Sequence, residues 1–440
     1  MESYHSQYLK RASRKRLISS APDPNLMMVV VIPCFNEPDL LGTLQNLFQC
    51  DHPLGRTEVI VVINSSLSSP KGVQEQNQKS LKEVSHWLNT ATNKWLTIHL
   101  LHIPNLPQKN AGVGLARKIG MDEAIRRLVD VKAEENGILI CYDADCRCSP
   151  NYLTSIEKHF LESPKTPGTS IYFEHPLNDY EMVKSGFGKL EESINQEEFE
   201  GISAYELHLR YHVRAQKHIN FPYAFQTIGS AMAVRAWAYI KQGGMNQRQA
   251  GEDFYFLQKI SWLGKVTELQ TATVYPSPRI SDRVPFGTGK AISNYIGSKQ
   301  QETYPLQAYR DVQWLIHQID WLWEFGHFKA PPAAPLAIFL GEKFLKEIIP
   351  EIRQNSTDSQ KFRKRFFRWF NAFRLMKYLN IAKDKFYGSN KVESAAQELL
   401  KEIGYQKKHE NIIDLLKQYR QLDRESFKPS EFQTNKSTTH

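Results

Sequence analysis

The stretch Ile138-Leu139-Ile140-Cys141-Tyr142-Asp143-Ala144-Asp145 places two aspartates, one residue apart, directly after a continuous apolar run. Such runs are typical of strands that are buried on both faces of a parallel sheet. Because residues i and i+2 of an extended segment point to the same side, Asp143 and Asp145 are predicted to share one face. Their carboxylate oxygens suit Mg²⁺ or Mn²⁺, which could bridge to a diphosphate. A solvated turn after the strand is the alternative.

Three further apolar runs precede this strand, and helical patterns separate them. The predicted strands are residues 27–33, 58–64, 95–102 and 137–142, and the predicted helices are 39–49, 73–90 and 112–129. This alternation with short connections predicts a doubly wound α/β unit over the first ~145 residues. Ligands of such sheets bind beyond the carboxyl ends of the strands. The candidate site residues therefore lie in the polar segments 33–37, 64–66, 104–109 and 143–148.

The pattern becomes less regular after residue 150, and helical patterns rich in Trp, Phe, Lys and Arg dominate from about residue 308. We expect an N-terminal basic segment over residues 1–25 and a catalytic α/β domain over residues 26–300. A helical C-terminal region would occupy residues 301–425, and a polar, disordered tail residues 426–440.

Composition narrows the classes of protein to consider. The chain of 440 residues has 56 Lys plus Arg against 47 Asp plus Glu. This modest basic excess favours anionic partners such as phosphates or a membrane surface, and no pattern indicates nucleic-acid binding. The five scattered cysteines indicate free thiols in a reducing compartment. With no signal-peptide pattern and no membrane-spanning run, we expect a cytoplasmic protein that could touch the inner face of the membrane.

A second acidic pair, Glu252-Asp253, opens a predicted helix whose apolar residues recur at 254, 257, 260 and 263. The helix dipole favours acids in a first turn, which is the structural explanation of the pair. The functional explanation is a general base, because an acceptor hydroxyl has a high pKa and needs a carboxylate to take its proton.

Two other polar segments flank predicted elements. Pro33-Cys34-Phe35-Asn36-Glu37 follows the first strand, and it either clamps a nucleobase or ribose or simply starts the next helix. The helix that begins near Gly112 carries the paired cations Arg117 and Lys118, which either reach a diphosphate or form a solvated face. This segment is neither a Walker A loop nor a Rossmann dinucleotide loop, because its spacing and its place in the chain differ.

The ordered set of motifs resembles that of the family 2 glycosyltransferases over roughly residues 26–275. Members typically carry Pro-x-x-Asn-Glu after strand one, a Gly-x-x-x-Ala-Arg helix, an Asp-x-Asp after strand four, and a Glu-Asp pair that opens a late helix. The matching residues here are Pro33/Asn36/Glu37, Gly112/Ala116/Arg117, Asp143/Asp145 and Glu252/Asp253.

The resemblance implies a GT-A fold, a Rossmann-like mixed sheet with an added C-terminal helical region. It also implies a metal-dependent transfer of a sugar from a UDP- or GDP-sugar to an acceptor hydroxyl. Asp145 would bind Mg²⁺ or Mn²⁺, and Asp143 would contact the metal site or the ribose. Asp253 would be the base of an inverting displacement, with Glu252 beside it at the acceptor site. Residues 229–235 would also lie near the acceptor.

The same resemblance assigns the nucleoside pocket to Pro33, Phe35 and Glu37. This chain departs from the family at Asn64, where members usually have an acidic residue near the base, so UDP and GDP donors both stay open. Lys118 replaces the usual Asn after Ala-Arg and could add a phosphate contact.

A long polar segment, residues 275–290, contains the cations Arg279, Arg283 and Lys290. We expect a lid that closes on the donor phosphates and in which Arg283 takes part; an ordinary surface loop is the alternative.

The stretch 361–373 places aromatic residues on one helical face among Lys and Arg, without any acid. It either lies on an anionic membrane surface or packs its aromatic face on the catalytic domain. His175, His208 and His212 lie in the catalytic span, where each is either a further metal ligand or a satisfied polar residue.

Three other functions stay open. A retaining enzyme that makes a small glycosylated solute would share the fold and the metal site, but Asp253 would not be its base. A nucleotidyltransferase would release pyrophosphate, and the absence of its Gly-rich loop after the first strand counts against it. A catalytically silent binding protein is disfavoured because the acidic motifs are intact.

Overall fold

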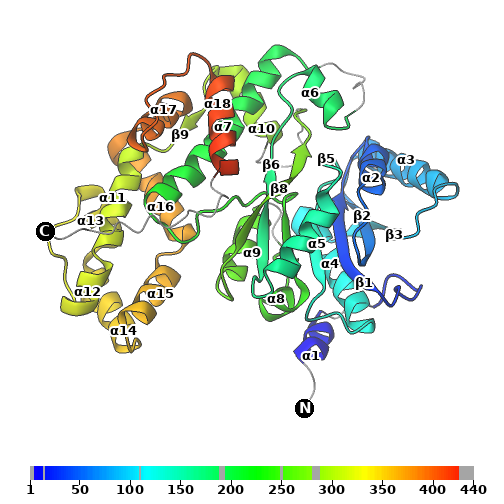
Figure 1. Ribbon diagram of the computed structural model, residues 1–440, viewed down its shortest axis with the longest axis horizontal. Coiled ribbons are helices and arrows are strands. Elements are labelled where there is room, and N and C mark those ends of the chain that lie inside the picture. Colours follow the sequence, from blue (N-terminus) through cyan, green and yellow to red (C-terminus); the bar gives the residue numbers. More distant parts are fainter. Residues whose placement is uncertain are drawn as a thin grey trace, which may run out of the picture.

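The computed structural model describes residues 4–12, 15–108, 111–187, 194–247, 251–279 and 288–425. These residues form an α/β unit on an eight-stranded mixed sheet, and a group of C-terminal helices lies beside it (Figure 1). The sheet and C-terminal helices that the sequence predicts for a GT-A fold are thus confirmed. The predicted tail lies outside the described residues.

The strands of the large sheet follow the order β3-β2-β1-β4-β7-β6-β8-β5. The strand bounds are β1 Leu26–Cys34, β2 Arg56–Ser66, β3 Leu96–Leu106, β4 Ile138–Cys141, β5 Cys146–Cys148, β6 Gly168–Phe173, β7 Met232–Arg235 and β8 Thr267–Pro276. The first four strands pair in parallel, whereas β7 runs antiparallel to both β4 and β6. The four strands predicted from apolar runs are therefore β1 to β4.

Helices cover both faces of the parallel half of the sheet. Their bounds are α2 Leu40–Phe48, α3 Lys71–Leu88, α4 Val113–Asp130 and α5 Tyr152–Glu162. The side chains of β1 are buried on both faces, which explains its continuous apolar run. Helix α4 packs so closely on β1 that a Cβ on Gly120 would lie 2.5 Å from Val31. This packing fixes the helix that carries Arg117.

After β6 the chain is mainly helical, apart from β7 and β8. Its elements are α6 Asp179–Lys184, α7 Gln196–His218, α8 Ala236–Lys241, α9 Glu252–Ile260, α10 Thr288–Ser298, α11 Leu306–His317, α12 Ile319–Phe325, α13 Ala334–Leu340, η2 Phe344–Ile348, α14 Ile349–Gln354, α15 Ser359–Trp369, α16 Ala372–Ala382, η3 Lys383–Tyr387, α17 Val392–Glu402 and α18 Ile412–Glu425, with the short pair β9 Glu302–Thr303 and β10 Asn390–Lys391. At the other end of the chain, α1 spans Tyr4–Arg11.

Helix α7 joins the two parts of the molecule. Its N-terminus is closed by a capping box between Asn195 and Glu198, which satisfies backbone N–H groups of the first turn. Its buried residues Leu207, Tyr211 and Ala215 share one apolar core with α11, α16, α17 and α18. The proposed division of the chain near residue 300 therefore separates elements that share a core.

The aromatic stretch 361–373 packs inside the C-terminal helices. Phe362 and Phe366 are fully buried, and the chain turns between α15 and α16 within this stretch. The aromatic face is therefore largely buried, mainly against other C-terminal helices and not, as the packing alternative had it, against the catalytic domain. In the described part of the chain, no helix is both long and apolar enough to cross a bilayer.

Candidate functional site

A cavity of about 820 Å³ lies beyond the carboxyl ends of β1, β2 and β4 and extends to α7 and α16. Its volume is in the range usual for sites that hold small molecules. We call the acids that line it, Asp143, Asp145, Glu252 and Asp253, the carboxylate wall. We call the uncharged residues from α7 and its neighbours the neutral wall; they are Tyr205, His208, His212, Gln216, Tyr223, Phe225, Gln226, Tyr304, Leu375 and Met376.

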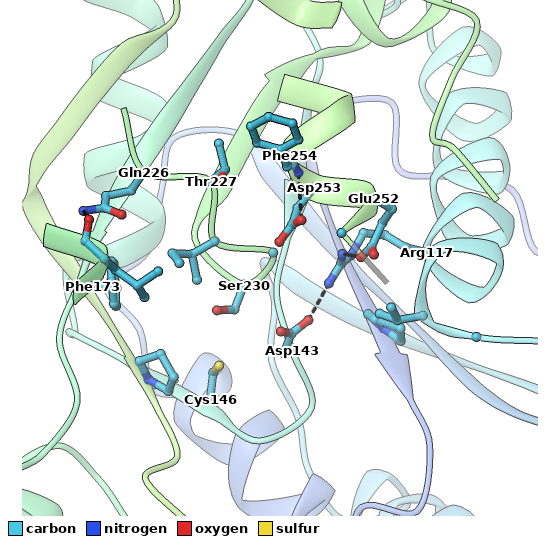
Figure 2. Close-up of a pocket in the computed structure, with 18 of the residues that line it drawn as sticks. Arg117, Asp143, Cys146, Phe173, Gln226, Thr227, Ser230, Glu252, Asp253 and Phe254 are labelled. Carbon is cyan, nitrogen blue, oxygen red and sulfur yellow. Dashed lines mark hydrogen bonds and ion pairs between the residues drawn. The ribbon is translucent and has the colours of Figure 1, made fainter. Parts of the chain in front are cut away.

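The carboxylate wall is organised around one guanidinium. Arg117, on α4, is almost completely buried, and its Nη2 donates to Asp143 Oδ1 at 2.6 Å (Figure 2). Its Nη1 donates to Glu252 Oε1, so the same side chain joins the two acidic motifs. The structure thus brings together Arg117, Asp143 and Glu252, which the sequence predicted separately.

The second acidic motif sits at the start of α9. Gly251 precedes it in the left-handed conformation, with a φ of 70°, and lets the chain turn into the helix. Both acids line the cavity, and Glu252 is the more buried of the two. Asp253 accepts a hydrogen bond from the Phe254 N–H at 2.7 Å. A Cβ on Gly229 would lie 3.1 Å from the Arg117 guanidinium and 3.2 Å from Asp253 Oδ2. The loop before β7 therefore approaches Arg117 and Asp253 closely.

The carboxylate wall carries more negative than positive charge. Burial and the neighbouring Glu252 raise the pKa of Asp253 to about 7, although Arg117 opposes this shift. Burial also raises the pKa of Asp143, against the opposing charge of Arg117, and Asp145 adds to the rise. Burial and the neighbouring negative charges both disfavour the ionised carboxylates, and a bound cation would offset this cost.

The acids of the carboxylate wall could supply only part of the ligand set of a divalent cation. No cluster of three or more His, Cys, Asp or Glu side chains is arranged to hold a metal in the described residues. Asp143 and Asp145 lie on one short segment and could supply two oxygen ligands. The usual way of binding Mg²⁺ at nucleotide sites is one or two carboxylates plus phosphate oxygens and water. The residues present therefore fit a cation that arrives with a diphosphate.

The predicted nucleoside residues divide into two groups. Pro33, Phe35 and Asn64 line the cavity at the ends of β1 and β2. Glu37 is completely buried and does not line it. Instead, its side chain accepts from the Asp39 N–H at 2.8 Å and pairs with Arg279. Glu37 thus holds Arg279, which does line the cavity.

Two predicted cations are not placed in the cavity. Lys118 is the neighbour of Arg117 on α4, but its Nζ lies 3.0 Å from Asp122 and 3.2 Å from the Tyr8 hydroxyl. It therefore belongs to the packing of α1 on α4 and does not line the cavity. Arg283, and with it half of the predicted lid, lies outside the described residues.

The neutral wall was not predicted from the sequence. Tyr205, His208, His212 and Gln216 recur every three or four residues, which places them along one face of α7. The Nδ1 atom of His208 is 2.8 Å from the Thr303 hydroxyl, and that of His212 is 2.6 Å from the Tyr309 hydroxyl. Neither histidine belongs to a group of metal-ligating side chains among the described residues, and each makes one hydrogen bond through its Nδ1 atom.

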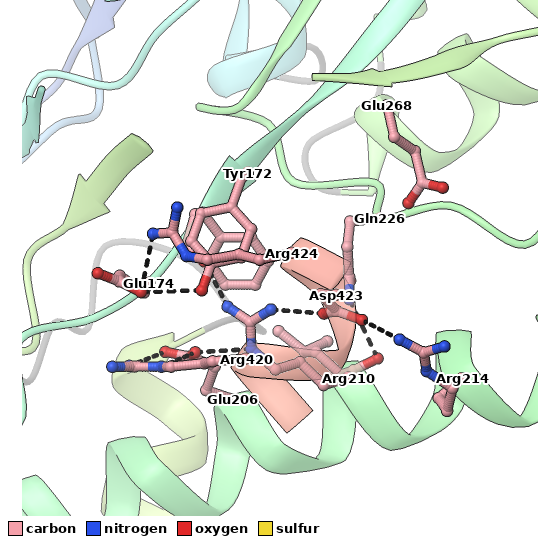
Figure 3. A network of polar contacts seen from close by, with 12 residues as sticks. Tyr172, Glu174, Glu206, Arg210, Arg214, Gln226, Glu268, Arg420, Asp423 and Arg424 are labelled. Atoms are coloured by element: carbon pink, nitrogen blue, oxygen red, sulfur yellow. Dashed lines mark hydrogen bonds and ion pairs between the residues drawn. The ribbon is translucent and has the colours of Figure 1, made fainter. Parts of the chain in front are cut away.

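The opposite side of α7 carries a buried ion network (Figure 3). Glu206 accepts hydrogen bonds from Arg210 and from Arg420 of α18, both at 2.8 Å. Asp423, also on α18, accepts from Arg210 at 2.6 Å. Burial opposes the charge of Glu206, but Arg420 and Arg210 hold its pKa well below the ordinary value. His175 belongs to this network too, since its Nδ1 is 2.9 Å from Glu206.

Comparison with known proteins gives distant structural likenesses. Neither a protein-family model nor a curated protein sequence matches the chain. Among solved structures, S. aureus TarS 1-349 in complex with UDP-GlcNAc is 14% identical, with a TM-score of 0.36 over 91% of this chain and 92% of that chain. Mannosyltransferase PcManGT from Pyrobaculum calidifontis, in complex with GDP-Man and Mn²⁺, is 14% identical, with a TM-score of 0.33 over 97% and 96% of the two chains. At these values the activity has to be inferred from the cavity itself.

Proposed function

We propose that this protein is a glycosyltransferase that moves a sugar from a nucleotide-sugar to an acceptor hydroxyl with inversion at the anomeric carbon. The observation that carries the proposal is the meeting of two acidic motifs in one cavity. Asp143 and Asp145 follow β4, Asp253 opens α9, and Arg117 ties the two segments together. A pair of acids for the leaving group and a separate acid for the acceptor are what such a displacement needs.

The donor would bind along the ends of the parallel strands. Pro33, Phe35 and Asn64 would contact the nucleoside, and the diphosphate would extend toward Asp143 and Asp145. Bound at these two aspartates, Mg²⁺ or Mn²⁺ would supply the positive charge that stabilises a leaving diphosphate. Arg117 holds Asp143 in position through its 2.6 Å hydrogen bond.

Asp253 would act as the general base. As the acceptor oxygen forms its bond to the anomeric carbon, the Asp253 carboxylate takes the hydroxyl proton, and the bond between carbon and the diphosphate oxygen breaks. The Phe254 N–H fixes one carboxylate oxygen of Asp253, which leaves the other for the acceptor. A pKa near 7 suits a base that works at neutral pH.

A thermal-shift experiment tests the donor site directly. UDP, GDP and their sugars would be added to the protein with and without Mn²⁺, since a ligand that binds only the folded state raises the melting temperature. We expect one nucleotide class to stabilise the protein in a Mn²⁺-dependent manner. The Asp145→Asn variant should lose this dependence, whereas Glu162→Gln on the exposed surface of α5 should keep it.

The reaction products separate this proposal from its rivals. A nucleoside diphosphate as leaving product and an inverted anomeric centre support an inverting transferase. A retained configuration would remove the role of Asp253 as base, and release of pyrophosphate would indicate a nucleotidyltransferase. Stabilisation by no nucleotide, even at millimolar concentration, would contradict the proposal as a whole.

A further inference from the structure

The two sides of α7 differ in charge. Glu206, Arg210 and Arg214 recur every four residues and are all engaged in the network with α18. Residues 205, 208, 212 and 216, on the cavity side, carry no formal charge at neutral pH. The charges of the middle of this helix are thus directed away from the cavity.

The other segments of the neutral wall continue this pattern. They come from the loop before β7, from Tyr304 before α11 and from α16. Among the described residues that these segments and α7 place against the cavity, none is Lys, Arg, Asp or Glu. A bound carboxylate or phosphate would therefore lack the Arg or Lys partner that compensates its loss of water, and it would also face the acids of the carboxylate wall.

The two histidines offer uncharged hydrogen-bonding groups. Burial lowers the pKa of His208 to about 4 and that of His212 to about 3, so both imidazoles are neutral near pH 7. Their Nδ1 atoms are occupied by hydroxyls, and no Nε2 partner is found in the part of the chain that the structure describes. A neutral imidazole nitrogen, like the amides of Gln216 and Gln226, matches a hydroxyl, which both donates and accepts.

Aromatic rings accompany these polar groups. The rings of His208 and His212 stack with their centroids 6.5 Å apart, and Tyr304 lies 5.7 Å from His212. Leu375 and Met376 add apolar surface from α16. This mixture of ring faces and a few hydrogen-bonding groups suits a molecule with both C–H faces and hydroxyls.

The neutral wall also adjoins the proposed base. Tyr205 and Asp253 line the same cavity. Burial, and after it the negative charge of Asp253, raises the pKa of Tyr205 to about 12. Tyr205 is the first residue of the cavity-facing stripe of α7. A molecule held along this stripe would therefore present a hydroxyl near Asp253.

We infer that the acceptor is an uncharged polyhydroxylated molecule, a sugar or a polyol, that binds against the neutral wall through His208, His212 and Gln226. The inference rests on the proposed function, because it assigns the acceptor of that same cavity.

The first test compares acceptors in matched pairs. With the nucleotide-sugar that binds, transfer would be measured to glucose against glucuronate and glucose 6-phosphate, and to glycerol against glycerate. We expect kcat/KM to be at least about tenfold higher for the neutral member of each pair. A preference for a carboxylated or phosphorylated member would overturn the inference, and so would failure to use any neutral member while the donor is hydrolysed.

The second test alters the wall. Gln226 is partly exposed, and among the described residues its side chain makes one weak polar contact, 3.5 Å from the Leu209 carbonyl, so Gln226→Lys should be tolerated. We expect this new cation to shift the ratio of kcat/KM at least about tenfold toward glucuronate. His212→Gln, which keeps an uncharged hydrogen-bonding group, should leave the ratio unchanged. An unchanged ratio in Gln226→Lys, with nucleotide binding intact, would contradict the inference.

Saturation-transfer NMR with glucose and glycerol, without any donor, separates this inference from the proposed function. Loss of the glucose signal in Gln226→Lys would locate the sugar at the neutral wall whether or not nucleotides bind. Nucleotide binding without any signal from neutral sugars would leave the proposed function standing and remove the inference.

Discussion

The two walls of the cavity are built in different ways. The carboxylate wall consists of residues that lie directly after β4 and in the first turn of α9, so short segments place its acids. The neutral wall depends on contacts between residues that are far apart in the sequence. His208 contacts Thr303, and Glu206, on the other side of α7, accepts a hydrogen bond from Arg420. The chemistry is thus positioned by the edge of the sheet, whereas recognition of the acceptor is positioned by the packing of the C-terminal helices.

The largest effect is expected at the carboxylate wall. Asp253→Asn keeps the shape of the side chain and an acceptor for the Phe254 N–H, but it removes the base. Turnover should fall by about 10²–10⁴-fold, the usual contribution of a general base, while nucleotide binding stays unchanged. Steady-state kinetics and thermal shifts with the nucleotide measure the two quantities. Turnover within about threefold of the original would assign the base to another residue.

The next largest effect is a loss of stability, expected when the buried ion network that holds α7 against α18 is broken. Glu206→Gln removes the carboxylate shared by Arg210 and Arg420, both buried, and should lower the free energy of unfolding by about 3–5 kcal/mol. Urea denaturation measures it. Arg424→Ala is the control on the same helix, because Arg424 is partly exposed and its pair with Glu174 at 3.4 Å should contribute at most about 1 kcal/mol. Equal losses in the two variants would show that the network does not hold α7.

The pH dependence should separate the two walls. Asp253 is active without its proton, and its pKa is raised to about 7, so kcat/KM should rise about tenfold per unit below pH 7 and level off above. His208 and His212 have lowered pKa values and stay neutral over this range. Binding of neutral sugar, followed by NMR, should therefore hardly change between roughly pH 5.5 and 8. A flat rate profile over that range would argue against Asp253.

The smallest effect is expected outside both walls. Lys364 and Arg365 are exposed on α15, whose aromatic side faces the core. The double substitution to Ala should change stability by less than about 0.5 kcal/mol and leave turnover unchanged. Co-sedimentation of the original protein and the double variant with anionic liposomes at low salt then tests the predicted membrane contact, to which the exposed basic side chains of α15 would contribute.

Much of the carboxylate wall could be predicted from the sequence. Apolar runs identify β1 to β4, and the polar residues after them reach one edge because parallel strands end there together. It is harder to predict from the sequence which of two adjacent residues faces the cavity. Arg117 and Lys118 differ in direction by about a third of a turn of α4, and this rotation sends one into the cavity and the other toward Asp122.

The neutral wall could not be predicted in the same way. The spacing of residues 205, 208, 212 and 216 reveals a helical face, but a face of mixed polarity does not indicate what it contacts. Its partners Thr303 and Tyr309 follow 95 and 97 residues later, beyond any local pattern. Likewise, only the three-dimensional structure shows that Glu37 is covered by Arg279.

The ion network behind α7 has a consequence during synthesis of the chain. Arg420 follows its partner Glu206 by 214 residues, which corresponds to roughly 10 to 40 s of translation at ordinary rates. Throughout this time Glu206 has Arg210 as its local partner but lacks the second guanidinium. On the ribosome the α/β unit can therefore form its carboxylate wall early, whereas the acceptor side is completed only after α18 has emerged. A nascent chain should acquire nucleotide binding before it acquires the ability to select an acceptor.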